Sequence, residues 1–271
     1  MLDEALRALA DAPLSILAGG TDFYPARVGR AVDEDVLDIT AIGELRGISQ
    51  TPRGFRIGAL TTWSDVAGAE LPPLFDCLKL AAREVGGLQI QNAATVAGNV
   101  CNASPAADGV PALLSLDAEV ELARADSRRV VPLESFIVGN RQTQRAPGEL
   151  VTAIHVPRWG PAARSTFKKL GARKYLVISI VMVSGVLETD ARGAIARCAF
   201  AVGACSSVAQ RLRELERELT GAALNADLTG RVRPEHLAPL APIADVRGTA
   251  EYRTDAALTL VRRTLEDLAG E

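Results

Sequence analysis

The chain has 271 residues, of which 48% are hydrophobic, and its formal net charge is −3. This length allows one large domain or two of ordinary size, with enough apolar material for a hydrophobic core. Basic and acidic residues alternate without a basic stripe, so no nucleic-acid partner is expected. No apolar run is long enough to span a membrane and no leader-like segment stands at the N-terminus, so we expect a cytoplasmic protein.

The first part of the chain is expected to alternate between helices and strands. Leucines recur on one helical face over residues 2–11, which predicts a short amphipathic helix. Buried strands are expected at 14–18 and 35–39, and an alternating strand at 54–60. Two prolines mark the start of a helix that runs to about residue 85.

The middle of the chain begins with a stretch that is poor in charge, residues 86–109. Its small and amide side chains match neither helical nor strand periodicity, so we expect loops there. A buried helix and three strands are expected next, at 110–116, 118–123, 128–132 and 149–157.

The segment 157–163, with two prolines and a glycine, is the best candidate for a domain boundary. Beyond it, strand-like runs predict an antiparallel sheet, followed by helices. The runs are residues 164–171, 176–188 and 195–205, and the helices are 207–221 and 254–270. The chain is therefore expected to be a mixed α and β protein in two parts joined near residue 160.

Two adjacent glycines, Gly19 and Gly20, follow the first expected strand directly, within the sequence Ala-Gly-Gly-Thr-Asp. Such a loop can turn successive backbone N–H groups into one concavity that binds an anion, and Thr21 adds a hydroxyl donor. Taken alone, the same sequence is more often a simple tight turn.

A second segment repeats this composition at residues 95–99, Thr-Val-Ala-Gly-Asn, and is followed by Ser104 and Asp108. Two such segments converging on one anion suggest a dinucleotide with two phosphates. A nearby carboxylate suits a sugar or ribityl hydroxyl, because it only accepts hydrogen bonds. The chain has neither the Rossmann glycine fingerprint nor the Walker loop, so neither of these supplies the site.

The remaining reactive residues give no sign of a catalytic or metal site. The four cysteines are far apart and are expected to be reduced thiols in or near the core. The two histidines, His155 and His236, lack partner motifs and are interpreted as structural. No catalytic residue and no metal ligand are therefore expected.

Together the two segments resemble motifs of a known family, the FAD-binding (medium) subunits of the molybdenum hydroxylases, which includes the flavin domain of xanthine dehydrogenase and the medium subunit of carbon monoxide dehydrogenase. Those motifs are A-G-G-x-[SD] and T-I-G-G-N followed by A-S-P-x-x-D. The segments Gly-Glu-Leu-Val-Thr-Ala-Ile-His-Val-Pro and Thr-Phe-Lys-Lys-Leu-Gly-Ala-Arg, and the C-terminal helices, also resemble the family. The resemblance therefore covers nearly the whole chain.

The resemblance implies an α+β fold in two domains. The first is a two-part FAD-binding domain of the PCMH (vanillyl-alcohol oxidase-like) type at residues 1–158, with subdomains of about 1–54 and 55–158. The second is a CO dehydrogenase flavoprotein-like C-terminal domain at residues 159–271, with an antiparallel sheet and helices.

The resemblance also implies the residues that hold FAD, without a covalent bond. The first loop and the second segment would surround the pyrophosphate, Asp108 would bind a sugar or ribityl hydroxyl, and Val151 would lie against the isoalloxazine. Lys168 would approach the polar edge of that ring, with Lys169 toward solvent. The expected cofactor-binding residues are Leu17, Ala18, Gly19, Gly20, Thr21, Asp22, Thr95, Gly98, Asn99, Ser104, Asp108, Val151 and Lys168.

The function implied is electron transfer within a molybdenum hydroxylase complex. A molybdopterin-binding large subunit would oxidise the substrate and a small subunit would relay electrons through [2Fe–2S] clusters. The chain would pass them through FAD to an external acceptor, which could be NAD, a quinone, ferredoxin or oxygen.

Three alternatives stay open at this point. The chain could be a self-sufficient FAD-dependent reductase or oxidase on the same fold, or a small-molecule binding module. It could also be a scaffold subunit without flavin, because Ala97 stands where the family usually has a glycine. Alanine does not tolerate φ > 0, so close approach of a phosphate at this position is in question.

Overall fold

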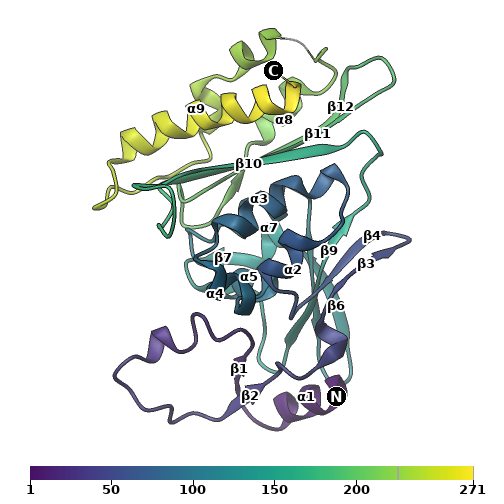
Figure 1. Cartoon of the computed structure of the whole chain (residues 1–271), viewed down its shortest axis with the longest axis vertical. Coiled ribbons are helices and arrows are strands. Elements are labelled where there is room, and N and C mark those ends of the chain that lie inside the picture. The colour runs from purple at the N-terminus through teal and green to yellow at the C-terminus, as the bar shows by residue number, and fades with distance from the viewer. Residues whose placement is uncertain (225, 271) are drawn as a thin grey trace.

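The computed structural model describes residues 1–224 and 226–270, which form two parts stacked along the long axis of the molecule. The N-terminal part, purple to teal in Figure 1, fills the lower and middle regions, and the C-terminal part, green to yellow, lies above it. Both parts combine helices with strands, so the expected α+β organisation is present.

The chain begins with helix α1 (Leu2–Asp11), whose leucine stripe is buried as the periodicity predicts. A small parallel sheet follows, in which β1 (Ser15–Leu17) pairs with β2 (Val36–Asp38). The long connection between these strands contains the short 3-10 helix η1 (Pro25–Arg27). A second 3-10 helix, η2 (Gly43–Leu45), leads toward the larger sheet.

A five-stranded antiparallel sheet is the framework of the N-terminal part. Its strand order is β3-β4-β9-β5-β6, so β9, which comes late in the chain, lies at the centre. The strands are β3 (Ile48–Thr51), β4 (Gly54–Gly58), β5 (Glu119–Ala123), β6 (Arg128–Pro132) and β9 (Leu150–Pro157). Within the sheet, His155 Nε2 lies 2.9 Å from Glu121 Oε2, which holds the pKa of Glu121 down at about 2.

Helices fill the space between this sheet and the C-terminal part. They share one hydrophobic core with the sheet, in which Trp63, Phe75 and Phe136 are completely buried. The elements are α2 (Trp63–Gly68), η3 (Pro73–Phe75), α3 (Asp76–Glu84), α6 (Gly109–Ser115), α7 (Leu133–Phe136) and the hairpin of β7 (Ile137–Gly139) and β8 (Gln142–Thr143).

The expectation of loops over residues 86–109 is wrong for much of that stretch. It contains helices α4 (Leu88–Ala93) and α5 (Val96–Asn102). Each is only two turns or fewer and is built from small and amide residues, so neither could show a clear apolar period of 3.6. A threonine cap signals the second helix, because Thr95 Oγ1 accepts a hydrogen bond from Gly98 N at 3.0 Å.

The C-terminal part is built on a four-stranded antiparallel sheet, as expected. The strands follow in the order β10 (Arg164–Leu170), β11 (Val181–Thr189), β12 (Ile195–Gly203) and β13 (Gln210–Arg211). Helix α9 (Ala250–Ala269) lies along the upper side of this sheet in Figure 1, and α3 and α6 contact it from below. The lower face of this sheet is therefore the surface that contacts the N-terminal part.

The helix expected over residues 207–221 is shorter than the sequence suggests. Helix α8 (Arg213–Leu219) begins only after Arg211, whose backbone pairs with β12 and whose guanidinium is buried against Glu216 and Asp117. The contact with Asp117 joins residues 94 positions apart, so no local pattern predicts it. Two 3-10 helices, η4 (Ala226–Arg231) and η5 (Pro234–Leu237), complete the fold.

Two features of the architecture bear on the expected division of the chain. Besides the large N-terminal core there is a separate core formed only by residues from 180 onward. An internal boundary after residue 54 would cut the β3–β4 hairpin, whose strands pair from Ile48↔Ile57 to Thr51↔Gly54. The subdomain bounds themselves stay a prediction.

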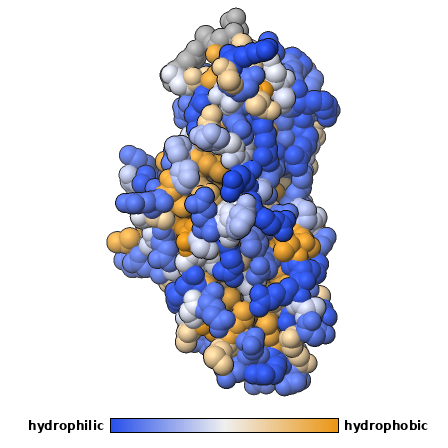
Figure 2. Space-filling model, turned by 90° about the vertical axis from the view of Figure 1, so that its right-hand side faces the viewer, coloured by the Kyte–Doolittle hydropathy of each residue, from blue (hydrophilic) through white to orange (hydrophobic). Residues whose placement is uncertain are grey.

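The surface is unevenly apolar. On the face shown in Figure 2, apolar patches gather over the lower and middle regions, and the upper end is largely polar. Among the helices that the structure describes, none combines the length and apolar character needed to cross a membrane.

Candidate functional site

A cavity of about 520 Å³ lies between the loop that follows β1 and the segment containing α4 and α5. Its volume falls within the range of roughly 300–1,000 Å³ that is usual for cofactor and ligand sites. Nine of the thirteen expected cofactor-binding residues line it: Ala18, Gly19, Gly20, Thr21, Asp22, Thr95, Gly98, Asn99 and Val151. The structure thus brings the two small-residue segments together around one space; which of these residues touch a cofactor stays a prediction.

The two glycines of the first loop are needed for different reasons. A Cβ on Gly19 would lie only 1.9 Å from the carbonyl oxygen of Ala93, so glycine lets the first loop pack directly on the backbone before the second segment. Gly20 has φ +72°, a left-handed backbone conformation that residues other than glycine rarely adopt. The bare backbone after β1 therefore joins the two segments and shapes the cavity between them.

The second segment presents its residues from the start of a helix. Thr95 Oγ1 accepts the hydrogen bond from Gly98 N, which leaves the hydroxyl hydrogen as a donor. Ala97 is an ordinary helical residue of α5, 4% exposed, and lines the cavity. It needs no positive φ, so the concern that alanine is incompatible with this position does not hold.

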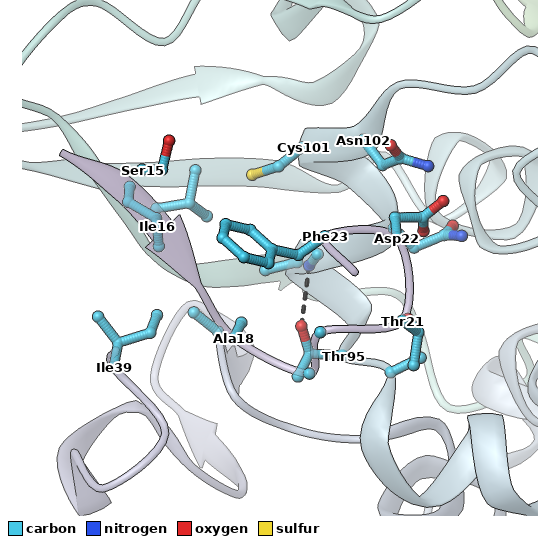
Figure 3. Close-up of a pocket in the computed structure, with 18 of the residues that line it drawn as sticks. Ser15, Ile16, Ala18, Thr21, Asp22, Phe23, Ile39, Thr95, Cys101 and Asn102 are labelled. Atoms are coloured by element: carbon cyan, nitrogen blue, oxygen red, sulfur yellow. Dashed lines mark hydrogen bonds between the residues drawn. The ribbon is translucent and has the colours of Figure 1, made fainter. Parts of the chain in front are cut away.

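Apolar side chains form much of the remaining wall. Figure 3 shows Ile16, Ala18 and Phe23 from the first segment, Ile39 from the end of β2, and Thr95 and Cys101 from the second segment around the same space. A wall of this kind excludes water and suits the flat faces of heterocyclic rings.

Two buried polar atoms of lining residues, Trp63 Nε1 and Asn99 Oδ1, lack a hydrogen-bond partner among the described residues. Both have almost no accessible surface, so neither faces the cavity directly. The fit to FAD rests instead on the first loop, whose glycine backbone can direct N–H groups at a pyrophosphate, and on the hydroxyl of Thr95. The residues present therefore fit this cofactor.

Sequence reasoning missed the cationic residues of the cavity, Arg27, Arg141 and Arg145. Arg27 is held by Glu34 and by the face of Phe23, whose ring centroid lies 3.7 Å from its guanidinium carbon. These arginines stand singly in a loop and a hairpin, outside any motif, so the sequence gives no signal that singles them out.

Four expected residues lie outside the cavity lining: Leu17, Ser104, Asp108 and Lys168. The carbonyl of Leu17 accepts a hydrogen bond from Ile39 N within the small sheet. The hydroxyl of Ser104 accepts one from Ala106 N at 3.3 Å. Asp108 is buried, and its two oxygens are engaged by Lys169 and Ser179 at 2.7 and 2.6 Å.

The expectation that Lys169 faces solvent is wrong, and Lys168 does not line the cavity. Lys168 Nζ lies 2.5 Å from Asp267 on α9, on the far side of the sheet. Lys169, with only 6% of its side chain exposed, pairs with Asp108 and donates to the carbonyl of Glu84. The two side chains do point to opposite faces of β10, as the strand alternation predicts. That alternation alone could not show that both faces of β10 are covered by other elements.

The other reactive groups are arranged largely as expected. Cys77, Cys198 and Cys205 are buried thiols, whereas Cys101 lines the cavity. His236 lies 3.0 Å from Glu218 and away from the cavity. Across residues 1–224 and 226–270, no group of three or more His, Cys, Asp or Glu side chains is placed to hold a metal ion.

Comparison with known families divides the chain into two matched regions. Residues 1–159 match the family described as the FAD binding domain in molybdopterin dehydrogenase. Residues 165–268 match the CO dehydrogenase flavoprotein C-terminal domain.

Individual relatives match along nearly the whole chain. The carbon monoxide dehydrogenase medium chain of Afipia carboxidovorans is 32% identical over 260 residues, covering 92% of this chain and 87% of the relative. The glyceraldehyde dehydrogenase medium chain of Sulfolobus acidocaldarius is 29% identical, covering 93% and 90%. A chain of carbon monoxide dehydrogenase from Oligotropha carboxidovorans superposes with a TM-score of 0.89 at 27% identity, over 98% of this chain and 94% of that one. The expected fold class is thereby confirmed.

Proposed function

The chain belongs to the family of FAD-binding subunits of the molybdopterin dehydrogenases, and we propose that it carries electrons from [2Fe–2S] clusters of a partner subunit through FAD to an external acceptor. The observation that carries the proposal is the cavity itself. Two segments separated by more than seventy residues, each with the composition expected for a pyrophosphate site, line one space of suitable size. No observation favours a self-sufficient enzyme, a binding module or a scaffold without flavin.

FAD supplies a group that accepts and releases electrons, and the chain's own residues bind and orient it. The loop of Gly19 and Gly20 presents backbone N–H groups to the pyrophosphate, and the hydroxyl of Thr95 donates from the opposite side. The apolar wall keeps water away from the rings of the cofactor.

The partners in this proposal are a molybdopterin-binding large subunit and a [2Fe–2S] small subunit. An exposed apolar cluster supports docking of another chain beside the cavity. Its members Leu88, Tyr175, Leu176 and Ile178 are 67%, 63%, 58% and 53% exposed. Leu176 approaches Gly87, so the loop after β10 and the start of α4 form this surface together.

We expect the tagged chain, isolated from its native host, to co-purify with a molybdopterin-containing chain and a [2Fe–2S] chain. In that complex, substrate should reduce the clusters before the flavin, as followed by absorbance in a stopped-flow instrument. Recovery of the chain alone with full substrate-oxidising activity would refute the proposed role.

A domain boundary between residues 158 and 159 is part of the same proposal. It is supported by the separate C-terminal core and by the break between the two matched regions.

A further inference from the structure

The turn of the β7–β8 hairpin holds Arg141 in an unusual conformation. Its φ is +60°, in the left-handed region that residues with side chains rarely adopt. Its backbone N–H donates to the carbonyl of Ala103 at 2.9 Å, and Ala103 itself has φ 47° at the end of α5. Two residues with left-handed backbone conformations are therefore joined by a hydrogen bond. Backbone strain of this kind is commonly found at functional sites.

This arrangement places the guanidinium of Arg141 at the rim of the cavity, between the two small-residue segments. Its Nη1 donates to Asn102 Oδ1 from the second segment, and it lies 3.9 Å from Asp22 Oδ1 of the first loop. The side chain is 59% exposed and lines the cavity. Arg141 thus spans the same gap that a pyrophosphate between the segments would occupy.

Two other cations line the cavity among the described residues, and neither bridges the two small-residue segments. Arg27 is paired with Glu34 and packed on Phe23, and Arg145 donates to the carbonyl of Glu149 at 2.9 Å. Arg141 has five N–H donors, and the described contacts use one of them in a hydrogen bond. It therefore has donors left for an anion, and its contacts reach both segments.

We propose that Arg141 binds the pyrophosphate of FAD and so makes the site selective for phosphorylated over unphosphorylated flavins. The proposal rests on the proposed function. Asp22 lies in the same loop as the glycines, and its carboxylate repels a pyrophosphate unless a cation neutralises it. The planar guanidinium matches two phosphate oxygens at once, and its charge, 3.9 Å from Asp22 Oδ1, also offsets that carboxylate.

The test is the variant Arg141→Gln in the full chain after removal of bound flavin, titrated with FAD and with ADP, which keeps the pyrophosphate but lacks the isoalloxazine. We expect both dissociation constants to rise about tenfold, the size of one lost charge-assisted contact. The slope of log Kd against log salt should become shallower, and Arg141→Lys should recover part of the affinity.

A matched control is Arg124→Gln, which makes the same charge change. Arg124 also has a carboxylate at 3.9 Å, is 44% exposed, and lies outside the cavity lining. We expect its dissociation constants to stay within about twofold of wild type, as for other surface substitutions. Wild-type affinity for FAD and ADP in a folded Arg141→Gln chain would overturn the proposal. If Arg141→Gln fails to fold, a folded Arg141→Met chain with wild-type affinities overturns it equally. Failure of the wild-type chain to bind FAD would instead count against the proposed function.

Discussion

Replacing Gly20 with valine is expected to give a chain without flavin, with FAD affinity reduced about a hundredfold or more. Gly20 has φ +72°, and a Cβ there would lie 2.8 Å from the ring of Tyr24. A β-branched residue at positive φ costs on the order of 1–2 kcal/mol for the conformation alone, before that clash. The loop must therefore adopt another path, which moves Thr21 and Asp22 away from their places on the cavity. Flavin content of the purified variant measures the effect.

The matched control for this experiment is Gly29→Val. Gly29 has φ +76° in the same long connection, but a Cβ there would meet nothing within 4 Å and the residue does not line the cavity. The control carries the same backbone strain, so it should lose some stability and keep its flavin. Normal flavin content in a soluble Gly20→Val chain would show that this loop does not hold the pyrophosphate.

The Lys169→Met variant is expected to lose about 3 kcal/mol of unfolding free energy at neutral pH, because it leaves the carboxylate of Asp108 buried without its counter-ion. The pair joins β10 to the residue before α6, so it also connects the two parts of the molecule. Lys168→Met is the control: its partner Asp267 is 45% exposed, and the loss should be about 1 kcal/mol or less. Denaturant unfolding measures both.

The difference between Lys169→Met and wild type should depend on pH in a defined direction. Burial raises the pKa of Asp108, and Lys169 and Ser179 act against this rise. Without Lys169 the folded-state pKa rises further, so the folded variant binds a proton more tightly than the unfolded chain does. Stability of the variant is then lost as pH rises through that pKa and regained as pH falls. The deficit should narrow in acid; equal losses in both lysine variants at every pH would contradict the buried pair.

Local patterns were sufficient for the elements whose neighbours in sequence are also their neighbours in space. The leucine period predicted α1, and the apolar runs predicted every strand of the two larger antiparallel sheets except β3 and β13. The paired glycines and the threonine-glycine segment together predicted nine residues of the cavity lining. Either segment alone is compatible with a simple turn or helix cap, and only the two together indicated one site.

What the sequence could not show depends on contacts between distant segments. The side chains of Lys168 and Lys169 point to opposite faces of β10, as in any strand. Which lysine points to which face depends on their partners, Asp267 on α9 for Lys168 and Asp108 for Lys169. Arg141 is held at the cavity by the hydrogen bond from its backbone N–H to the carbonyl of Ala103, a contact between distant segments. The clash that makes Gly19 necessary lies with Ala93, which no pattern within the first loop contains.

The central claim is that this chain holds one FAD in the cavity between its two small-residue segments. The most direct measurement is an equilibrium titration of the purified full-length chain, freed of flavin, with FAD, following flavin fluorescence and the visible absorption bands. We predict saturation at one FAD per chain, with ADP competing for the same site. A folded chain that neither carries flavin when purified nor changes the fluorescence of added FAD would contradict the account.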